Sequence, residues 1–445
     1  MRSLPRLRVF DQSGHPGARR FLVTESGKPF FYQADTAWEL FHRLNREEAE
    51  LYLRDRARKG YTVIQAVVLA ELDGLRTPNP YGHLPLHDED PTKPNEAYFQ
   101  HVDAIVNLAE SLGLYIGMLP TWGDKFHRKW GVGPEIFTPE NARIYGEYVG
   151  RRYRNKPIIW ILGGDRAVET ETHRAIVRAM AEGLRAGDGG AHLMTYHAWG
   201  GLQPSQILHA EPWLDFNMLQ SGHSKQYEQN DDWITENLRL QPSKPCMDGE
   251  PNYENHPINF NPENGWFGAY DVRRACYLAL FAGAHGHTYG CHEIWQMYEP
   301  GKHSPVTHAR LSWRQALGLP GASQIQYARR LVMSRPMLMR IPDQSLIRSE
   351  VGKGAVRMRA CRSADGSYAF VYVPPMGKPF TLATGNLEGR RLIGWWYDPR
   401  NGRAQEMGRF AREPERTFQS PDPQQDWVLV LDEEARRYPP PGRMR

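Results

Sequence analysis

The sequence predicts an α/β protein: a (β/α)8 TIM barrel followed by a small all-β sandwich domain. Strand-like and helix-like patterns alternate eight times over residues 1–340, as a barrel of parallel strands with crossover helices requires. Beyond residue 340 only short strand-like runs remain. The length of 445 residues fits a barrel of about 250 residues or more with one smaller module.

The first four predicted strands are short apolar runs, each connected to a helix. The helix after the first strand ends at Lys59-Gly60, and the helix before the third stops at Gly113. Both endings are typical because glycine readily stops a helix. Thr138-Pro139 begins another helix, with threonine as cap and proline at the first position. The four strands are expected at 30–35, 61–68, 114–119 and 157–162.

The second half of the chain's first 340 residues continues the alternation. Helices are expected over 172–185 and 273–282. An irregular segment at 71–94 is rich in Pro, Gly, His and Asp, and irregular segments of that length usually serve as lids or binding loops. The remaining strands are expected at 192–196, 214–219, 244–247 and 285–289.

The predicted domains are 1–340 (barrel), 341–436 (β-sandwich) and 437–445 (flexible tail). Asp365-Gly366 lies between two strand-like runs and is a hairpin signal. Three aromatic residues, Trp395, Trp396 and Tyr397, could bind glycan, but we expect them to pack the sandwich or its interface with the barrel. The strand-like runs lie at 355–362, 367–373, 391–397 and 427–431.

Composition and charge exclude several classes of protein. Lys plus Arg number 55 against 51 Asp plus Glu, a net charge of +4, and no basic stripe suggests a nucleic-acid partner. No apolar stretch approaches the roughly 20 residues that span a bilayer, so no membrane partner is expected. The four cysteines suggest no disulfide framework, and the N-terminus as given has no secretory apolar core. We therefore expect a cytoplasmic location; the native start and the oligomeric state stay open.

Two carboxylates are the candidate catalytic residues. Asp165 and Glu250 each stand at the end of a short apolar run, with glycine immediately before. A parallel barrel gathers the C-terminal ends of its strands around one cleft, and two acids brought together there are the usual equipment for cleaving a glycosidic bond. Alternatively, Asp165 caps a helix and Glu250 is a solvated loop residue; Asp248 and Glu254 are rivals for the role of Glu250.

Polar and aromatic residues at other strand ends form a candidate substrate-binding set. Packing alone does not explain so many of them, and aromatic faces stack on the C–H faces of sugar rings. The set favours a polyhydroxylated ligand, and carbohydrate is the expected partner. Its members are Asp35, Trp38, Gln65, Trp122, His197, Trp199, Gln220, His223, Tyr253 and Trp295.

Two other chemistries fit less well. His285, His287 and His292 suggest a metal site, but their spacing matches no compact zinc pattern, and alternate strand residues face the same side by pleating alone. Ser221-Gly-His223 lacks the nucleophile elbow of serine hydrolases. We therefore expect neither a metal nor another cofactor.

The chain resembles the apiosidase-like glycosidases, which comprise glycoside hydrolase family 140 and the group called domain of unknown function 4038. The resemblance covers about residues 15–340. It rests on Phe-Tyr-Gln-Ala-Asp35-Thr-Ala-Trp38, Ile-Ile-Trp-Ile-Leu-Gly-Gly-Asp165 and Asp-Gly-Glu250-Pro. The C-terminal segment resembles a collagen-binding-type β-sandwich, although nothing in it implies collagen.

The resemblance implies a retaining glycoside hydrolase that acts on a terminal sugar of a plant-type oligosaccharide or glycoside. By position it makes Asp165 the acid/base and Glu250 the nucleophile. Most members of the wider retaining clan have Asn-Glu where this chain has Gly164-Asp165, while the apiosidase-like group shares the Asp. The alternatives are an endo-acting glycanase and a non-catalytic carbohydrate-binding protein on a degenerate barrel.

Overall fold

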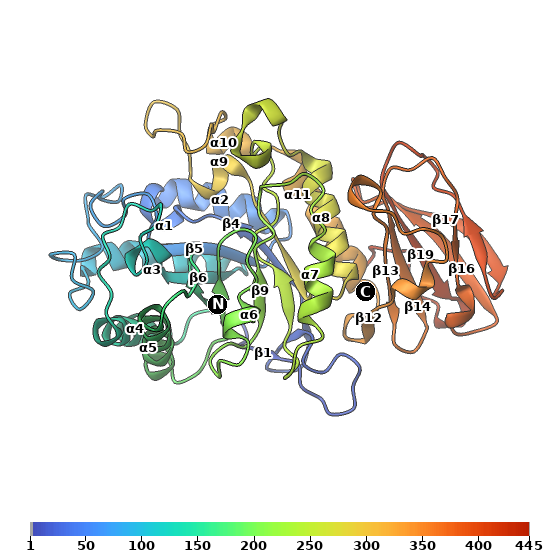
Figure 1. Cartoon of the computed structure of the whole chain (residues 1–445), viewed down its shortest axis with the longest axis horizontal. Helices are drawn as coiled ribbons and strands as arrows, with labels where there is room; N and C mark the ends of the chain where they lie inside the picture. The colour runs from blue at the N-terminus through green and yellow to red at the C-terminus, as the bar shows by residue number, and fades with distance from the viewer. Residues whose placement is uncertain (1–2, 445) are drawn as a thin grey trace.

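The computed structural model describes residues 3–444. Its larger part is a curled parallel sheet, or half-barrel (Figure 1). The sheet has six strands in the order β11-β4-β5-β6-β7-β8, and β9 pairs with β10 in a separate parallel sheet. The strands are β4 (Tyr32–Thr36), β5 (Val63–Leu69), β6 (Tyr115–Thr121), β7 (Ile158–Gly163), β8 (Met194–His197), β9 (Asn217–Leu219), β10 (Cys246–Asp248) and β11 (Gly286–Tyr289).

All eight predicted parallel strands are present, but the predicted barrel is closed only in part. The strand ladder is interrupted between β8 and β9 and between β10 and β11. One backbone hydrogen bond crosses each interruption, from Asp215 N to Met194 O (2.8 Å) and from His285 N to Cys246 O (3.0 Å). Both interruptions flank the three-residue strands β9 and β10.

Helices cover the outer face of the curled sheet (Figure 1). The Thr138 cap is confirmed: its Oγ1 accepts a hydrogen bond from Asn141 N. Asn45 and Glu48 form a similar reciprocal cap at the start of α2. The helices are α1 (Leu40–Arg43), α2 (Arg46–Arg58), α3 (Glu96–Ser111), α4 (Pro139–Tyr153), α5 (Glu171–Asp188), α6 (Ser205–Leu208), α7 (Asn230–Asn237), α8 (Ala269–Phe281), α9 (His292–Trp295), α10 (Trp313–Ala316) and α11 (Pro320–Met333).

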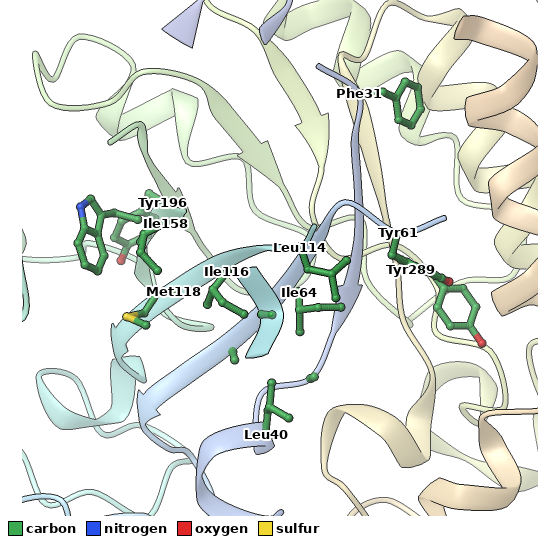
Figure 2. Close-up of a cluster of buried hydrophobic side chains, with 14 of the residues drawn as sticks. Phe31, Leu40, Tyr61, Ile64, Leu114, Ile116, Met118, Ile158, Tyr196 and Tyr289 are labelled. Carbon is green, nitrogen blue, oxygen red and sulfur yellow. The ribbon is translucent and has the colours of Figure 1, made fainter. Parts of the chain in front are cut away.

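The hydrophobic core lies on both faces of the parallel sheet. Successive strand residues point to opposite faces, so Ile64 packs toward the helices while Val63 and Val67 pack inside the curl. Figure 2 shows part of the helix-side cluster, including Ile64, Ile116 and Met118. Burial of such side chains on both faces holds the strand ends, and the loops that leave them, in fixed positions.

The C-terminal domain is all-β, and its two sheets enclose a core of their own. The larger is antiparallel with the order β12-β13-β14-β19-β16-β17, and the smaller pairs β15 with β18. Phe380 and Phe418 of the small sheet pack with Trp396 of the large one. The strands are β12 (Arg340–Pro342), β13 (Arg359–Ser363), β14 (Tyr368–Val373), β15 (Phe380–Leu382), β16 (Arg391–Tyr397), β17 (Ala404–Ala411), β18 (Arg416–Phe418) and β19 (Trp427–Glu433).

The two domains are joined by stacked aromatic rings. Tyr277 and Phe281 of α8 stack on Tyr372 and Phe370 of β14, with ring centroids 5.5 and 5.6 Å apart. Buried side chains of both domains belong to one continuous cluster. Trp395, Trp396 and Tyr397 are all buried, which agrees with a packing role.

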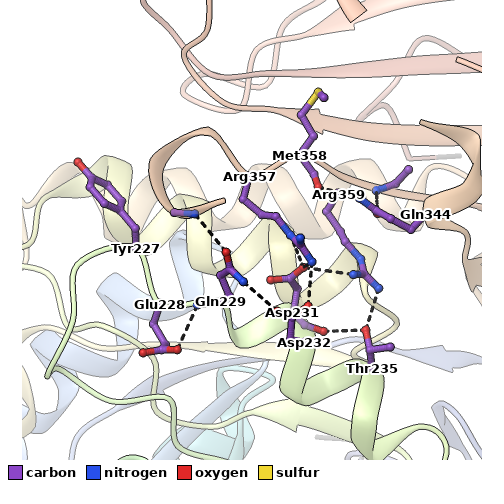
Figure 3. A network of polar contacts seen from close by, with 12 residues as sticks. Tyr227, Glu228, Gln229, Asp231, Asp232, Thr235, Gln344, Arg357, Met358 and Arg359 are labelled. Atoms are coloured by element: carbon purple, nitrogen blue, oxygen red, sulfur yellow. Dashed lines mark hydrogen bonds and ion pairs between the residues drawn. The ribbon is translucent and has the colours of Figure 1, made fainter. Parts of the chain in front are cut away.

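Ion pairs also cross the domain boundary. Asp231 of α7 receives Arg357 and Arg359 from the C-terminal domain, at 2.9 and 3.2 Å (Figure 3). Arg335, just before the boundary, forms a buried two-point pair with Asp432 of β19 at 2.8 and 2.6 Å.

The ends of the described chain also make contacts that the sequence did not suggest. Near the N-terminus, β1 (Leu7–Val9), β2 (Leu22–Thr24) and β3 (Pro29–Phe30) form a small antiparallel sheet. In the predicted flexible tail, Gly442 N donates to Ser334 Oγ at 3.1 Å. Within residues 3–444, no helix combines the length and apolar character needed to cross a membrane.

Candidate active site

A cavity of about 460 Å³ opens at the C-terminal ends of the parallel strands. Each of the eight strands is followed, within a few residues, by at least one side chain that lines it. The lining residues are Trp38, Glu71, Trp122, Trp130, Asp165, Trp199, Gly200, Gln220, Gly222, His223, Ser224, Glu250, Tyr253, His256, Phe260, His292, Trp295, Val306 and Thr307.

Asp165 reaches the cavity through an unusual backbone turn at the end of β7. Gly163, Gly164 and Asp165 all have positive φ angles, of 91°, 92° and 59°, a region that costs residues other than glycine energy. A Cβ on Gly163 would lie 2.3 Å from His197 O, and one on Gly164 2.8 Å from Gly123 N. The two glycines are therefore required by both conformation and space, and the strained Asp165 is held by its surroundings.

Hydrogen bonds fix this turn against the neighbouring strand end. Gly164 N donates to His197 O at 3.0 Å, and Asp165 N donates to Nδ1 of the His197 ring at 3.4 Å. Since Nδ1 accepts this hydrogen bond, a ring proton must lie on Nε2. That nitrogen lies 3.1 Å from Glu250 Oε2, so one histidine contacts both candidate catalytic residues.

Side-chain hydrogen-bond donors surround the carboxylate of Glu250. Gln220 Nε2 donates to its Oε1 at 2.8 Å, and His223 Nε2 lies 3.1 Å from the same oxygen. With His197 on Oε2, donors face both carboxylate oxygens. Because Glu250 is only 6% exposed, these contacts replace the water that would otherwise stabilise its charge.

The two carboxyls have pKa values shifted in opposite directions. Burial raises the pKa of Asp165 to about 6, and the negative charge of Glu250 adds to the rise. Burial would also raise the pKa of Glu250, but hydrogen bonds from His197 and His223 outweigh it and lower that pKa well below its usual range. Asp165 therefore holds a proton under mildly acidic conditions in which Glu250 is ionised.

Two groups of aromatic side chains line the cavity. In the first, Trp130 and Trp199 lie 5.2 Å apart between ring centroids, with Arg166 over Trp130 at 4.3 Å. In the second, His223 stacks on His256 with centroids 4.4 Å apart, and Phe260 lies against both rings. Trp130 and Phe260 remain 57% and 50% exposed, so ring faces and edges are available to a ligand.

Nine of the predicted site residues line this one cavity. They are the two carboxylates and seven members of the predicted substrate-binding set, namely Trp38, Trp122, Trp199, Gln220, His223, Tyr253 and Trp295. The cavity lining does not include Asp35, Gln65 or His197. His197 is fully buried behind the cavity wall, where it contacts Glu250.

Asp35 must be removed from the substrate-binding set. Its carboxylate accepts from Tyr52 Oη at 2.6 Å and from Arg56 Nε at 2.5 Å, both on α2. Strand pleating points Asp35 toward the helix layer. Its neighbour Thr36 points inside the curl and is 3.4 Å from Gln65 Nε2.

Gln65 is also a structural residue. Its amide is fully buried inside the curled sheet and donates to Gly249 O at 3.3 Å, next to Glu250. Gln65 thus supports the backbone of a candidate catalytic residue without reaching the cavity.

Asp248 and Glu254, the alternatives to Glu250, form hydrogen bonds that stabilise the fold. Asp248 accepts from Ser221 Oγ and Asn230 Nδ2 at 2.6 and 2.9 Å. Glu254 accepts from Tyr289 Oη and Gly321 N at 2.6 and 3.0 Å. Neither residue lines the cavity.

The three histidines that suggested a metal site, His285, His287 and His292, do not form one cluster at the cavity. His285 and His287 are fully buried, and burial lowers the pKa of each to about 3, so their rings are neutral. His292 lines the cavity, and its Nε2 faces the carbonyl oxygens of Val306 and Thr307. Among residues 3–444, no three His, Cys, Asp or Glu side chains are grouped in a way that could hold a metal ion.

Sequence reasoning missed several loop residues that line the cavity, above all Glu71, Trp130, His256 and Phe260. Glu71 opens the long segment that was expected to border the site, and this position was the available signal. Trp130 lies 8 residues after Trp122, and no local pattern fixes how a loop folds back over a cavity.

Comparisons with known proteins decide the family. A family model described as "Apiosidase-like, catalytic domain" matches residues 17–339. The chain belongs to the apiosidase-like family. The C-terminal domain matches a model described as "Putative collagen-binding domain of a collagenase" over residues 341–432.

Solved structures agree with this assignment. The apiosidase-like chain is 32% identical to a protein named "Glycoside hydrolase", with a TM-score of 0.88 and 97% of each chain covered. It is 30% identical to a glycoside hydrolase of family 5 from Bacteroides vulgatus, with a TM-score of 0.89, covering 98% of this chain and 94% of that one. The search of curated proteins gave no match. The apiosidase-like chain is thus a glycoside hydrolase, and its substrate is a carbohydrate.

Proposed function

We propose that this enzyme is a retaining glycoside hydrolase, with Glu250 as nucleophile and Asp165 as acid/base. The observation that carries the proposal is that two carboxyls with opposite pKa shifts share one cavity. A retaining enzyme needs this division, because one carboxyl must attack as an anion while the other donates a proton. The carboxyl groups are then expected about 5–5.5 Å apart.

In the first step, a carboxylate oxygen of Glu250 attacks the anomeric carbon. The glycosidic C–O bond breaks as the proton of Asp165 passes to the leaving oxygen, which leaves a glycosyl ester and an ionised Asp165. His197, His223 and Gln220 hold the attacking carboxylate in one orientation.

In the second step, Asp165 takes a proton from water, and the resulting nucleophile attacks the anomeric carbon and releases Glu250. Esterification removes the charge of Glu250, which is the second cause of the raised Asp165 pKa. Its pKa therefore falls in the intermediate, so the residue that was an acid becomes a base.

We further propose that the eight parallel strands form a (β/α)8 barrel. We also propose that the enzyme removes a terminal sugar, and the family match makes apiose the first candidate. The leaving group would lie against Trp130 and Trp199, since Arg166, the residue after Asp165, packs on Trp130. The long segments 71–94 and 252–264 would limit the length of the cavity, as both contribute residues that line it.

The assignment is tested with two kinds of apioside. Asp165→Asn should lower kcat/KM by about 10²–10⁴-fold for an alkyl apioside, and far less for p-nitrophenyl apioside, whose leaving group needs little protonation. Glu250→Gln should abolish turnover of both. Glu147→Gln, on the outer surface of α4, is the control and should match the wild type. Activity of either site variant within a few-fold of wild type on the alkyl apioside would remove that residue from the mechanism.

A further inference from the structure

Glu71 is a third carboxyl at the cavity, and it has no role in the proposed mechanism. It follows β5 and lines the cavity together with Asp165 and Trp38. Within residues 3–444 its carboxyl has no hydrogen-bond partner. Glu71 is only partly buried, so its unpaired carboxyl is accessible to a ligand in the cavity.

The backbone on both sides of Glu71 is anchored. Ala70 O accepts from the buried Lys125 Nζ at 2.6 Å, and Leu72 N donates to the buried Glu39 Oε1 at 3.1 Å. Two buried charged side chains thus hold the residues before and after Glu71. These two hydrogen bonds hold the backbone at Glu71 so that its side chain lies at the cavity wall.

The nearby cations Arg166 and Lys125 form hydrogen bonds and ion pairs with groups other than Glu71. Arg166 donates from Nε to His127 O, from Nη1 to Asp165 O and from Nη2 to Arg128 O, at 2.7–2.8 Å. Lys125 pairs with Asp124 at 2.7 Å in addition to holding Ala70. Both cations therefore have other partners, and neither forms a hydrogen bond or ion pair with Glu71 in the described chain.

The surroundings of Glu71 favour the uncharged acid. Burial raises its pKa well above the usual value, and the carboxylates of Asp165, Glu39 and Asp124 raise it further, against the attraction of Arg166 and Arg43. A neutral carboxyl offers one O–H donor and one carbonyl acceptor, which matches the donor and acceptor character of a sugar hydroxyl.

We propose that Glu71 is a substrate-binding residue that hydrogen bonds to a hydroxyl of the sugar cleaved from its glycoside. This rests on the proposed function, because it assumes that the sugar bonded to Glu250 occupies the cavity. It adds a specificity determinant: sugars lacking that hydroxyl leave Glu71 buried and unpaired, and are rejected.

The test pairs variants with substrates that each lack one hydroxyl. For p-nitrophenyl apioside, Glu71→Ala should lower kcat/KM by about 10–100-fold, mainly through KM, as expected for a lost hydrogen bond to a buried partner. Against the monodeoxy analogue that lacks the bonded hydroxyl, the same variant should lose less than about 3-fold, because that contact is already missing. Glu71→Gln, which keeps a donor and an acceptor without charge, should stay within about 5-fold of wild type.

Glu89→Ala is the matched control, since it removes a carboxyl from the same long segment, where Glu89 forms an exposed pair with Arg76. Equal losses for Glu71→Ala on the parent substrate and on every deoxy analogue would show a structural effect and overturn the proposal. So would a Glu71→Ala variant within about 3-fold of wild type on the parent substrate. A Gln variant as impaired as the Ala variant would overturn the neutral form.

A second measurement separates this proposal from the proposed function. Calorimetry with D-apiose in the Glu250→Gln background measures binding without turnover. Weaker apiose binding in the Glu71→Ala/Glu250→Gln double variant would support the role of Glu71 in binding the sugar. Hydrolysis retained by Glu250→Gln would contradict the proposed mechanism but not this role. Equal apiose affinity with and without Glu71 would overturn the Glu71 proposal while leaving the mechanism standing.

Discussion

Asp165 and Glu250 share one cavity, yet their contacts give the two carboxyls opposite proton affinities. Donors from Gln220, His223 and His197 face Glu250. Asp165 Oδ1 and Glu250 Oε2 are both buried without a hydrogen bond of good geometry, but Glu250 Oε2 has His197 Nε2 at 3.1 Å. The number of donors around each carboxylate, more than its depth, decides which one is ionised.

The first prediction concerns pH. Asp165 must be protonated to act as an acid, so kcat/KM for an alkyl apioside should fall about tenfold per pH unit above about 6. The acidic limb should lie well below the usual glutamate range, because the pKa of Glu250 is lowered. A pH–rate profile measures both limbs. Activity that rises through pH 7 and above would contradict the assignment of Asp165 as the acid.

At the residue scale, the sequence predicted those side chains whose position follows from a strand end. Asp165 and Glu250 were found because glycines break the apolar runs before them. Asp35 was misassigned because pleating, which points it at Arg56, depends on where the strand begins relative to the sheet. Glu71 and Trp130 were missed because loop paths depend on tertiary contacts.

The end of β7 is the element on which the site depends most. Its final residues turn through positive φ angles that bring the Asp165 carboxyl into the cavity. The turn is bonded to His197 on β8 and to Gly123 after β6. Three neighbouring strand ends therefore fix the side chain proposed as the acid/base, and a rigid sheet can preorganise a catalytic group in this way.

The second prediction tests this turn. Gly164→Ala adds a Cβ 2.8 Å from Gly123 N and 2.9 Å from the Trp122 ring, so Asp165 must move. We expect kcat/KM to drop by about 100-fold or more, since a shift of about 1 Å in a catalytic group can cost that much.

Gly190→Ala is the control for that prediction. Gly190 also has positive φ, 72°, but nothing lies within 4 Å of an added Cβ. This variant should lose about 1–2 kcal/mol of stability and keep its activity. Equal effects of the two substitutions on kcat/KM would show that the turn at Gly164 has no special role in placing Asp165.

At the element scale, periodicity predicted all eight parallel strands and helices α2, α3, α4, α5 and α8, but not α7 or α11. It did not predict the interrupted ladder beside β9 and β10, because apolar runs do not reveal which backbone groups pair. The β17 strand was also missed. It is largely exposed, and an exposed strand at the edge of a sheet carries little apolar alternation.

At the scale of the whole molecule, the two domains share a core. The stacked rings of α8 and β14 and the buried Arg335–Asp432 pair resemble the interior of a single domain more than a loose interface. We therefore expect the two domains to unfold in a single transition.

The third prediction tests that coupling. Arg335→Ala leaves Asp432, whose side chain is 3% exposed, without its partner, and should cost about 3–5 kcal/mol in the free energy of unfolding. Arg436→Ala, which breaks exposed pairs with Asp365 and Glu433, should cost no more than about 1 kcal/mol. Urea denaturation measures both. Similar values for the two variants, or two separate transitions in the wild type, would contradict the shared core.

The domain order was predictable from the change in pattern near residue 340. The contacts that join the domains were not, because Arg273 of α8 and Asp426 beside β19 are 153 positions apart and nothing local marks them as partners. Long-range ion pairs of this kind follow from the packing of whole elements.

The central claim, that Glu250 is the nucleophile of a retaining hydrolase, is tested most directly by trapping the covalent intermediate. A 2-deoxy-2-fluoro apioside with a good leaving group slows the second step, and mass spectrometry of the digested protein locates the added sugar. The sugar should be found on the peptide that carries Glu250, and Glu250→Gln should remain unlabelled. A label on another carboxylate, or turnover that gives the inverted anomer without any label, would contradict the mechanism.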